Sequence, residues 1–460
     1  MILLHWYNVA MDFLKEYIKN EEKKLHSEFD LLADKAYELL EKTKGKNPIR
    51  VYLSQQTIGS VNTPSEKDSI PHLCEDLLNL DKELSLKLSS FIEKSFLFSS
   101  NYPSIEIGLN SKESIDKTGI IILPKIKAIW SGKSVKEHHC DNDFDIGNFT
   151  YCQINDSPLL KKYKLNCIFL GLPEISSKLF DNDGKKTINF AGTPLSNLYT
   201  PKYFIQDVDE DGTKLSKIFF DNSYDSQTEE KIENLILQTI YDSNLNKDDI
   251  LVFPEAMLSR KIIESVIEKI RSRPQKYLKI IVLPTIWEKM DGKDYGKNFS
   301  IIIDGQGREI CKQEKLISYI HEEDDKSIPE AILPDNQINL MYLNDFGCIS
   351  VLICRTFLET AFRLFCNSEL CTTLLLCPAY STGVHEFMQG IEANKEFAVN
   401  TIWCNSCSIG NSNEKVVISK YIRGDRNENN NFIFYSTDCN KICHNQNCSC
   451  IARTPLTVQK

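Results

Sequence analysis

The sequence predicts an α/β protein in its C-terminal half, joined to an N-terminal region that begins with helix. Through most of residues 1–100, apolar residues recur at three- and four-residue spacing, which is typical of amphipathic helices. Short apolar runs bounded by turn residues follow between Pro103 and Phe220, and these indicate strands. From about Lys217 onward, strand and helix patterns alternate regularly, and this alternation predicts sheets covered by helices.

Size and composition are those of a globular protein. The chain has 460 residues, of which 42% are hydrophobic and 26% charged, so it is long enough for two or three domains with a sizeable core. A net charge of −10 gives no electrostatic reason to expect nucleic acid or an anionic membrane as a partner. No run approaches the roughly 18 apolar residues that a membrane span needs.

The N-terminal segment and the cysteines indicate a cytoplasmic protein. The first residues lack the basic region and the small-residue cleavage site of a signal peptide. Most of the 16 cysteines lie singly inside apolar runs such as "GCISVLIC" and "TTLLLCPAY". This pattern favours reduced, buried thiols over a disulfide framework.

The helical and strand patterns suggest a division into two parts. Residues 1–210 are predicted to be a separate α+β region of unknown type, helical over 1–100 and strand-rich over 103–210. Its strand signals include "TGIIILPKIKAIW", "NCIFLGLPEI" and "KKTINFAG". Residues 215–460 are predicted to form the α/β domain, with a cysteine-rich tail.

The α/β domain can be followed element by element. The strand "KIFF" precedes the helix "EEKIENLILQTIYDS", the strand "DILVFPE", the helix "LSRKIIESVIEKIRSR" and the strand "KIIVLPT". The turn "GQG" then joins "NFSIIID" to "REICKQEKL", which is a hairpin signal. After a loop come the strand "GCISVLIC", the helix "TFLETAFRLF", the strand "TTLLLCP", the helix "HEFMQGIEANKEFAVN" and the strand "TIWC".

Three chemically matched residues follow predicted strands in this domain. Glu255 ends "DILVFPE", Lys315 ends "REICKQEK", and Cys354 ends "GCISVLIC". Because functional residues of α/β sheets gather at the carboxyl ends of strands, we expect the three side chains to meet. A carboxylate can take the thiol proton, helix amides after Cys354 can stabilise the thiolate and an oxyanion, and an ammonium can stabilise a tetrahedral intermediate. Such a set would cleave a carbon–nitrogen bond through a thioester or thioimidate.

With these residues in this order, the chain resembles the nitrilase superfamily of carbon–nitrogen hydrolases, which use a Glu-Lys-Cys triad. The resemblance runs over about 217–410 and rests on "LVFPE", "NFSIIIDGQGREICKQEK", "GCISVLICRTFLETAFRL", "LLLCPAY" and "GIEANKEFAVNTIWCN". It implies a four-layer αββα sandwich with Glu255, Lys315 and Cys354 as catalytic residues. It also implies a small amide or nitrile substrate, no required cofactor, and a homo-oligomer that pairs through the helices after the nucleophile.

The sequence departs from the family pattern just before the lysine. Gln313 and Glu314 stand where the family has an aromatic residue and an arginine. Counting from the turn glycine Gly307, Lys315 falls where the family lysine falls. Lys312 lies three residues earlier, so on a strand it faces the opposite side. We therefore choose Lys315.

The resemblance further implies residues that bind substrate or position the base. The family often has a second glutamate shortly after the lysine, for which Glu323 fits best and Glu322 next. Arg355 follows the nucleophile, where many members have an aromatic or acidic residue. We expect its backbone N–H to serve the oxyanion and its side chain to alter the pocket.

Two functional classes remain open from the sequence. The first is a cysteine-dependent amidase or related hydrolase, which the complete Glu-Lys-Cys set favours. The second is a catalytically altered binding or regulatory module, used in a defence or signalling system, which the unusual neighbours Gln313, Glu314 and Arg355 favour.

Metal sites are weaker predictions. Four tail cysteines and a nearby histidine could hold tetrahedral zinc, although their spacing is not that of a standard zinc ribbon or finger, and reduced surface cysteines are the alternative. The zinc candidates are Cys439, Cys443, Cys448 and Cys450. The segment "DVDEDG" at 207–212 resembles the start of a calcium loop but lacks the glutamate at position twelve, so we expect a turn between strands. "EHHCDND" at 137–143 is expected to be a polar loop.

Overall fold

The protein is described by a computed structural model over most of its length. The described residues are 2–42, 69–98, 102–107, 120–124, 144–146, 149–153, 159, 161–170, 185–195, 201–210, 213–323, 326–343, 347–370, 372–394, 397, 399–407, 414–420, 433–438 and 450–459.

Two sheets form the centre of the molecule. The eight-stranded sheet has the order β1 (Ser104–Ile107), β5 (Lys164–Phe169), β16 (Gln337–Leu343), β17 (Gly347–Val351), β18 (Leu374–Ala379), β19 (Asn400–Asn405), β20 (Glu414–Lys420) and β21 (Ile433–Asp438). The seven-stranded sheet has the order β11 (Ile286–Lys289), β12 (Gly296–Ile303), β10 (Ile280–Val282), β9 (Ile250–Val252), β6 (Lys185–Gly192) and β22 (Ala452–Gln459), with β13 (Glu309–Glu314) paired to β12.

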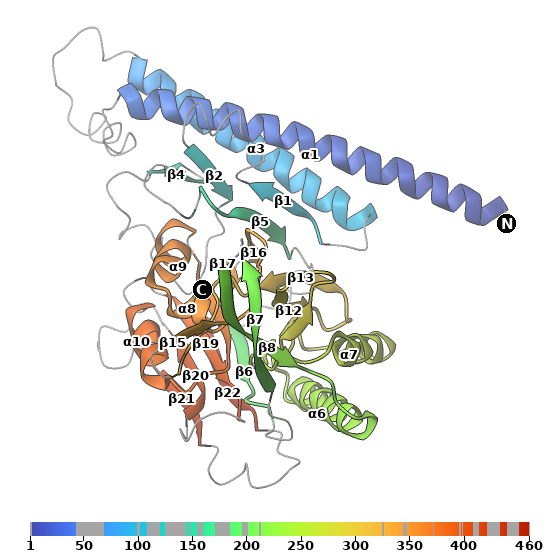
Figure 1. Cartoon of the computed structure of the whole chain (residues 1–460). Helices are drawn as coiled ribbons and strands as arrows, with labels where there is room; N and C mark the ends of the chain where they lie inside the picture. The colour runs from blue at the N-terminus through green and yellow to red at the C-terminus, as the bar shows by residue number, and fades with distance from the viewer. Residues whose placement is uncertain are drawn as a thin grey trace.

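Helices cover the outer face of each sheet. On one side of the molecule, α6 (Ser226–Leu245) and α7 (Arg260–Ser272) pack their isoleucines and leucines against the seven-stranded sheet. On the other side lie α8 (Arg355–Leu358), α9 (Thr360–Leu364) and α10 (Val384–Asn394), whose buried aromatic residues pack against the eight-stranded sheet. Figure 1 shows these two helix groups on opposite sides of the strands. The predicted four-layer αββα sandwich is therefore confirmed.

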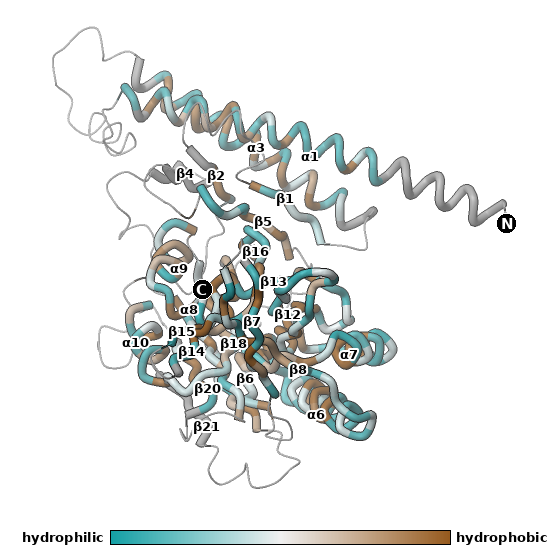
Figure 2. The backbone as a smooth tube through the Cα atoms, in the orientation of Figure 1, coloured by the Kyte–Doolittle hydropathy of each residue, from teal (hydrophilic) through white to brown (hydrophobic). Residues whose placement is uncertain are grey.

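Some central strands are apolar on both faces, and this explains why the two sheets stack against each other rather than each leaving one face in solvent. β9, β10 and β17 are buried at every residue, as expected for strands covered on both faces. One face of β9 packs with the eight-stranded sheet and the other with α6 and α7. The hydropathy colouring of Figure 2 shows the same division, with brown strands inside and mostly teal outer faces on α6 and α7.

The sandwich includes strands from the region predicted to be a separate N-terminal body. β5 pairs parallel with β16, β1 pairs with β5, and β6 pairs parallel with β9. These segments of 103–210 therefore belong to the two sheets, so the sandwich begins well before residue 215. The strand "KIFF" is instead part of a separate hairpin. Local sequence patterns indicate a strand but not its partner, and this is why the boundary was misplaced.

The described part of residues 1–100 is helical, as the apolar spacing predicts, and its two helices pair with each other. The two are α1 (Ile2–Lys42) and α3 (Ser69–Phe98), which run antiparallel (Figure 1). Lys87 Nζ lies 2.7 Å from Glu28 Oε1, and Lys94 Nζ donates to the Tyr17 hydroxyl at 3.0 Å. A small sheet of β2 (Ile120–Pro124), β4 (Phe149–Gln153) and β3 (Phe144–Ile146) lies beside them.

Two hairpins stand apart from the main sheets and lie next to each other. They are β7 (Lys202–Glu210) with β8 (Thr213–Asp221), and β14 (Ile320–Glu323) with β15 (Lys326–Pro329). A bridge between Ile218 and Glu330 joins them. The described residues of "DVDEDG" belong to β7, while Asp211 and Gly212 lie outside the described residues. The whole of "EHHCDND" also lies outside them.

None of the helices that the structure describes is long and apolar enough to cross a membrane.

Candidate active site

Glu255 is buried just beyond the end of β9. The residue is only 1% exposed, and its backbone N–H donates to the Ala379 carbonyl at 3.3 Å. The Thr285 hydroxyl accepts hydrogen bonds from the N–H groups of Ala256 and Met257, at 3.0 and 3.1 Å. These contacts fix the loop after β9, so the carboxylate is held in one place.

Lys315 lies directly after β13 and points into the same buried region. Its Nζ is 2.8 Å from Glu255 Oε1 and 2.6 Å from Glu330 Oε2, and the residue is 3% exposed. Lys312, the other candidate, is exposed and lies 3.7 Å from Glu309. The alternation of side chains along β13 thus separates the two lysines as expected, and Lys315 is the one that meets Glu255.

A second glutamate and an asparagine complete the cluster. The Asn298 side-chain amide, on β12, donates to Glu255 Oε1 at 2.7 Å and to Glu330 Oε1 at 3.0 Å. The Tyr319 backbone N–H donates to Glu330 Oε2 at 3.2 Å. Sequence reasoning missed both residues. Each does leave a signal, because each is a polar residue inside an apolar run, "NFSIII" and "IPEAIL".

The second carboxylate beside Lys315 belongs to Glu330, so Glu322, one of the two predicted residues, does not fill this position. Glu322 is exposed and accepts a hydrogen bond from the Ser327 hydroxyl at 2.7 Å. Glu323 pairs in register with Lys326, next to the tip of the β14–β15 hairpin. At the end of this hairpin the chain returns to Lys315 at Glu330.

Cys354 lies at the turn from β17 into α8. It has a left-handed backbone conformation, with φ of 47°, which is strained for a residue with a side chain. Its N–H donates to the Pro378 carbonyl at 2.8 Å, and its Sγ lies 3.7 Å from the Tyr380 carbonyl oxygen. The Thr356 hydroxyl accepts from the N–H groups of Leu316 and Ile317, at 3.0 and 3.2 Å. The turn after the cysteine is therefore tied to the loop after the lysine.

The electrostatics of the three predicted residues are coupled. Burial is the main cause that raises the pKa of the Cys354 thiol, the Glu255 carboxylate raises it further, and the Lys315 ammonium partly opposes them. For Lys315, burial by itself lowers the pKa, but attraction to Glu255 and Glu330 outweighs it and raises the pKa. Both shifts favour the protonated forms, a neutral thiol beside a charged ammonium.

A pocket of about 290 Å³ opens above the cluster. Glu255 and Lys315 form part of its wall, and Tyr380, whose carbonyl oxygen faces the Cys354 sulfur, forms another part. The other described residues that line it are Tyr203, Ile218, Phe220, Met257, Tyr319, His321, Ser381 and Thr382. The arrangement gives a small ligand access to a carboxylate and an ammonium at one place.

The residues that depart from the family pattern lie away from this pocket. The Gln313 side chain is buried and accepts from the Asn339 backbone N–H at 3.0 Å, so it joins β13 of one sheet to β16 of the other. Glu314 pairs with Lys297 at 2.8 Å. Arg355 is partly exposed and pairs with Glu359 at 2.9 Å. The expectation that the Arg355 side chain alters the pocket is therefore wrong.

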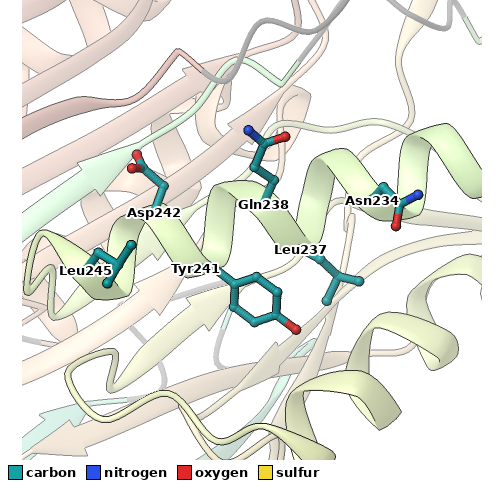
Figure 3. Close-up of a pocket in the computed structure, with 6 residues that line it drawn as sticks. All are labelled: Asn234, Leu237, Gln238, Tyr241, Asp242 and Leu245. Atoms are coloured by element: carbon teal, nitrogen blue, oxygen red, sulfur yellow. The ribbon is translucent and has the colours of Figure 1, made fainter.

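A second hollow, on the surface of α6, has no comparable chemistry. Figure 3 shows its six lining residues, Asn234, Leu237, Gln238, Tyr241, Asp242 and Leu245, along one helix. Asp242 pairs with Arg453 of β22 at 2.7 Å, and the Tyr241 ring lies under the Arg273 guanidinium at 4.4 Å. These contacts stabilise the helix, and the lining includes no thiol or ammonium.

Within the described part of the chain, no group of three or more His, Cys, Asp or Glu residues could hold a metal ion. Of the four zinc candidates, only Cys450 lies in that part, where it is buried and forms no disulfide. Cys439, Cys443 and Cys448 lie outside the described residues. The zinc prediction therefore has no support.

Comparison with known proteins gives likenesses of structure only. No protein-family model and no curated protein matches the sequence. Among solved structures, the chain is similar to Nit3 from Saccharomyces cerevisiae, a member of branch 10 of the nitrilase superfamily, with 14% identity, 59% of this chain and 90% of that chain covered, and a TM-score of 0.36. It is also similar to the C. elegans NitFhit protein, with 12% identity, coverages of 59% and 61%, and a TM-score of 0.38. An amidase mutant from Nesterenkonia sp. AN1 matches with 11% identity, coverages of 58% and 90%, and a TM-score of 0.36.

At TM-scores below 0.5 and identities this low, these likenesses assign neither a family nor an activity to this chain.

Proposed function

We propose that this protein is a cysteine-dependent carbon–nitrogen hydrolase that acts on a small amide or nitrile. The observation that carries the proposal is the buried cluster of Glu255, Lys315 and Glu330, which lies beside Cys354 and opens to a pocket. Burying two carboxylates and an ammonium is costly, so a cluster retained at a pocket wall favours a chemical role over a structural one.

In the proposed reaction, Glu255 is the general base and then the general acid. It accepts the proton of the Cys354 thiol as the sulfur attacks the carbonyl carbon of an amide. The tetrahedral intermediate collapses, the C–N bond breaks, and Glu255 returns the proton to the departing ammonia. Glu255 then takes a proton from water, which attacks the thioester and releases the acid and the thiol. A nitrile would pass through a thioimidate, which water converts to the same thioester with loss of ammonia.

The raised pKa of Cys354 fits this order of events. A thiol that stays protonated at rest needs a base at the moment of attack, and the carboxylate is the neighbouring group that can supply one. Lys315, held between the two carboxylates, would stabilise the negative oxygen of the intermediate. The backbone N–H of Arg355, the first residue of α8, is proposed as a second oxyanion donor.

Glu330 and Asn298 are proposed as positioning residues. Glu330 holds the ammonium from the side opposite Glu255, and Asn298 donates to both carboxylates. With these contacts, Lys315 has two anionic partners and cannot swing out of the site without leaving a buried charge unpaired.

A catalytically altered binding module is the alternative. The unusual residues Gln313, Glu314 and Arg355 suggest it in the sequence, but their side chains bond to Asn339, Lys297 and Glu359 rather than to the pocket. That placement favours the enzyme.

Two further expectations belong to the proposal. A cytoplasmic location is supported by the ten cysteines whose side chains the structure describes, since none of these forms a disulfide and nine are buried. Homo-oligomerisation through α8 and α9 is proposed from the resemblance. The aromatic residues Phe357, Phe362 and Phe365 are buried within the chain, so Leu364, which is exposed, is the apolar residue of α9 that such a contact would use.

The test of the function is ammonia release combined with thiol labelling. Purified full-length protein would be incubated with a panel of small amides and nitriles, and ammonia would be measured for the wild type and for Cys354→Ala. We expect release that requires Cys354, and a mass increase on Cys354 from the trapped acyl group after acid quenching. Cys407→Ala, which removes a partly exposed cysteine, is the matched control. Release that persists in Cys354→Ala would contradict the mechanism.

A further inference from the structure

We infer that the pocket takes an uncharged amide or nitrile carrying an aromatic ring, and that Tyr203 on β7 is the residue that selects it. This inference rests on the proposed carbon–nitrogen hydrolase function and adds the class of substrate. Three features carry it: the charges of the pocket wall, a row of aromatic rings, and the face that the β7–β8 hairpin turns to the pocket.

The charged groups of the wall are already paired with one another. Among the described lining residues, Lys315 is the only lysine or arginine, and its ammonium lies between the carboxylates of Glu255 and Glu330. Among these residues, therefore, no lysine or arginine is available to pair with a substrate carboxylate, which would instead face the carboxylate of Glu255. Like charges placed together disfavour binding, so the wall selects against anionic substrates.

Aromatic rings stand in a row at the pocket. The His321 ring lies 6.1 Å from the Tyr203 ring and 6.4 Å from the Tyr319 ring, measured between centroids. Tyr203 is 55% exposed and Tyr319 is 40% exposed, so both keep ring surface that a ligand can cover. Aromatic pairs prefer centroid separations of about 4.5 to 7 Å in offset or edge-to-face geometry, and a ligand ring beside these two tyrosines would reach that geometry.

The hairpin that carries Tyr203 supplies one apolar wall of the pocket. In the β7–β8 register Tyr203 lies opposite Phe220, and Ile205 lies opposite Ile218, so these four side chains share one face. Tyr203, Phe220 and Ile218 all line the pocket. The hairpin is inserted between β6 and α6, outside both main sheets, so its residues can set specificity without changing the sheets that hold the cluster.

The size of the pocket limits the substrate further. Its volume of about 290 Å³ lies at the lower end of the range for ligand pockets, about 300 to 1,000 Å³. That volume suits one ring and the C–N group better than a long chain or a second ring system.

Binding to a variant without the nucleophile tests the inference separately from catalysis. Calorimetry on full-length Cys354→Ala would compare phenylacetamide, propionamide and succinamate, the last being an anionic monoamide. We expect phenylacetamide to bind at least about 10-fold more tightly than succinamate. Equal or tighter binding of succinamate, or no binding of phenylacetamide, would overturn the inference.

Substitutions at Tyr203 test its role in the same background. We expect Tyr203→Ala to weaken phenylacetamide binding by about 3- to 10-fold, since one aromatic contact is lost. Tyr203→Phe should stay within about twofold of the parent. Leu215→Ala, on the same hairpin and 40% exposed but not lining the pocket, should have no effect. Unchanged binding in Tyr203→Ala would remove Tyr203 from the inference.

The two proposals fail differently. If phenylacetamide binds preferentially but wild-type protein releases ammonia from no amide or nitrile, the hydrolase function fails and the inferred ligand class stands. If ammonia is released but succinamate is the better ligand, the hydrolase function stands and the inferred ligand class fails.

Discussion

Lys315 and Glu330 approach more closely than any other charged pair of the site, with 2.6 Å between Nζ and Oε2. The contact from Lys315 to Glu255 is 2.8 Å, so one ammonium serves two carboxylates. All three side chains are buried. A buried ammonium with two anionic partners costs much free energy to neutralise. If the ammonium is removed, the two buried carboxylates are left without a cation, which also costs free energy. The first three predictions follow from this arrangement.

Removal of the ammonium should damage both folding and activity. We expect Lys315→Ala to lower the free energy of unfolding by about 3 to 5 kcal/mol, because two buried carboxylates lose their cation. Denaturant unfolding followed by circular dichroism measures this loss. Lys312→Ala, at the exposed lysine three residues earlier, should stay within about 0.5 kcal/mol of the wild type. Similar small losses in both variants would show that the cluster contributes little to stability.

Replacement of the proposed base should separate catalysis from stability. Glu255→Gln keeps an oxygen that can accept from Asn298 and Lys315, so we expect a modest change in unfolding free energy. Ammonia release should fall by at least about 100-fold, because an amide cannot take the thiol proton. If Glu255→Gln kept full turnover on a substrate that the wild type consumes, Glu255 would be a structural residue.

The second glutamate should matter where the two sequence-predicted glutamates do not. Glu330→Gln weakens the hold on Lys315, so we expect kcat to fall by about 10- to 100-fold with a smaller change in KM. Glu322→Gln, exposed and bonded to Ser327, is the matched control and should behave as wild type. Steady-state kinetics on a substrate found in the panel would measure both. A loss confined to Glu322→Gln would reverse the assignment made from the structure.

Asp249, between α6 and β9, provides a test of pH dependence. Burial raises its pKa to about 6, although the N–H of Asn189 donates to it at 2.9 Å. Because the pKa in the folded state lies above the unfolded value of about 3.9, ionisation destabilises the protein, and the cost is fully present above pH 6. The cost disappears as the pH falls from about 6 to about 4.

Asp249→Asn should therefore stabilise the protein by about 1 to 3 kcal/mol at pH 8 and by almost nothing at pH 4. Thermal unfolding of both proteins across this pH range measures the difference. Asp249→Ala removes the acceptor of the Asn189 N–H and should not show the same gain. A stabilisation by Asp249→Asn that is constant with pH would show that the carboxyl is not perturbed.

Local sequence patterns were enough to predict the alternating strands and helices from about residue 250, the "GQG" hairpin, and the choice of Glu255, Lys315 and Cys354. These features are local, since strand ends, turn glycines and side-chain alternation are set by neighbouring residues. Gly307, with φ of 73° in the turn between β12 and β13, is one example, because it takes a conformation that glycine adopts most readily. From that turn, the alternation along β13 directs Lys315 rather than Lys312 into the site.

Local patterns could not predict which strands share a sheet or which glutamate is the second partner of Lys315. β5 and β6 read as isolated strands in the sequence, and their places beside β16 and β9 depend on pairing across long loops. The register of β14 with β15 places Ile320 opposite Pro329, so the next pair outward is Tyr319 and Glu330, which returns Glu330 to the lysine. A hairpin register depends on pairing between two segments, and spacing along one segment cannot reveal it.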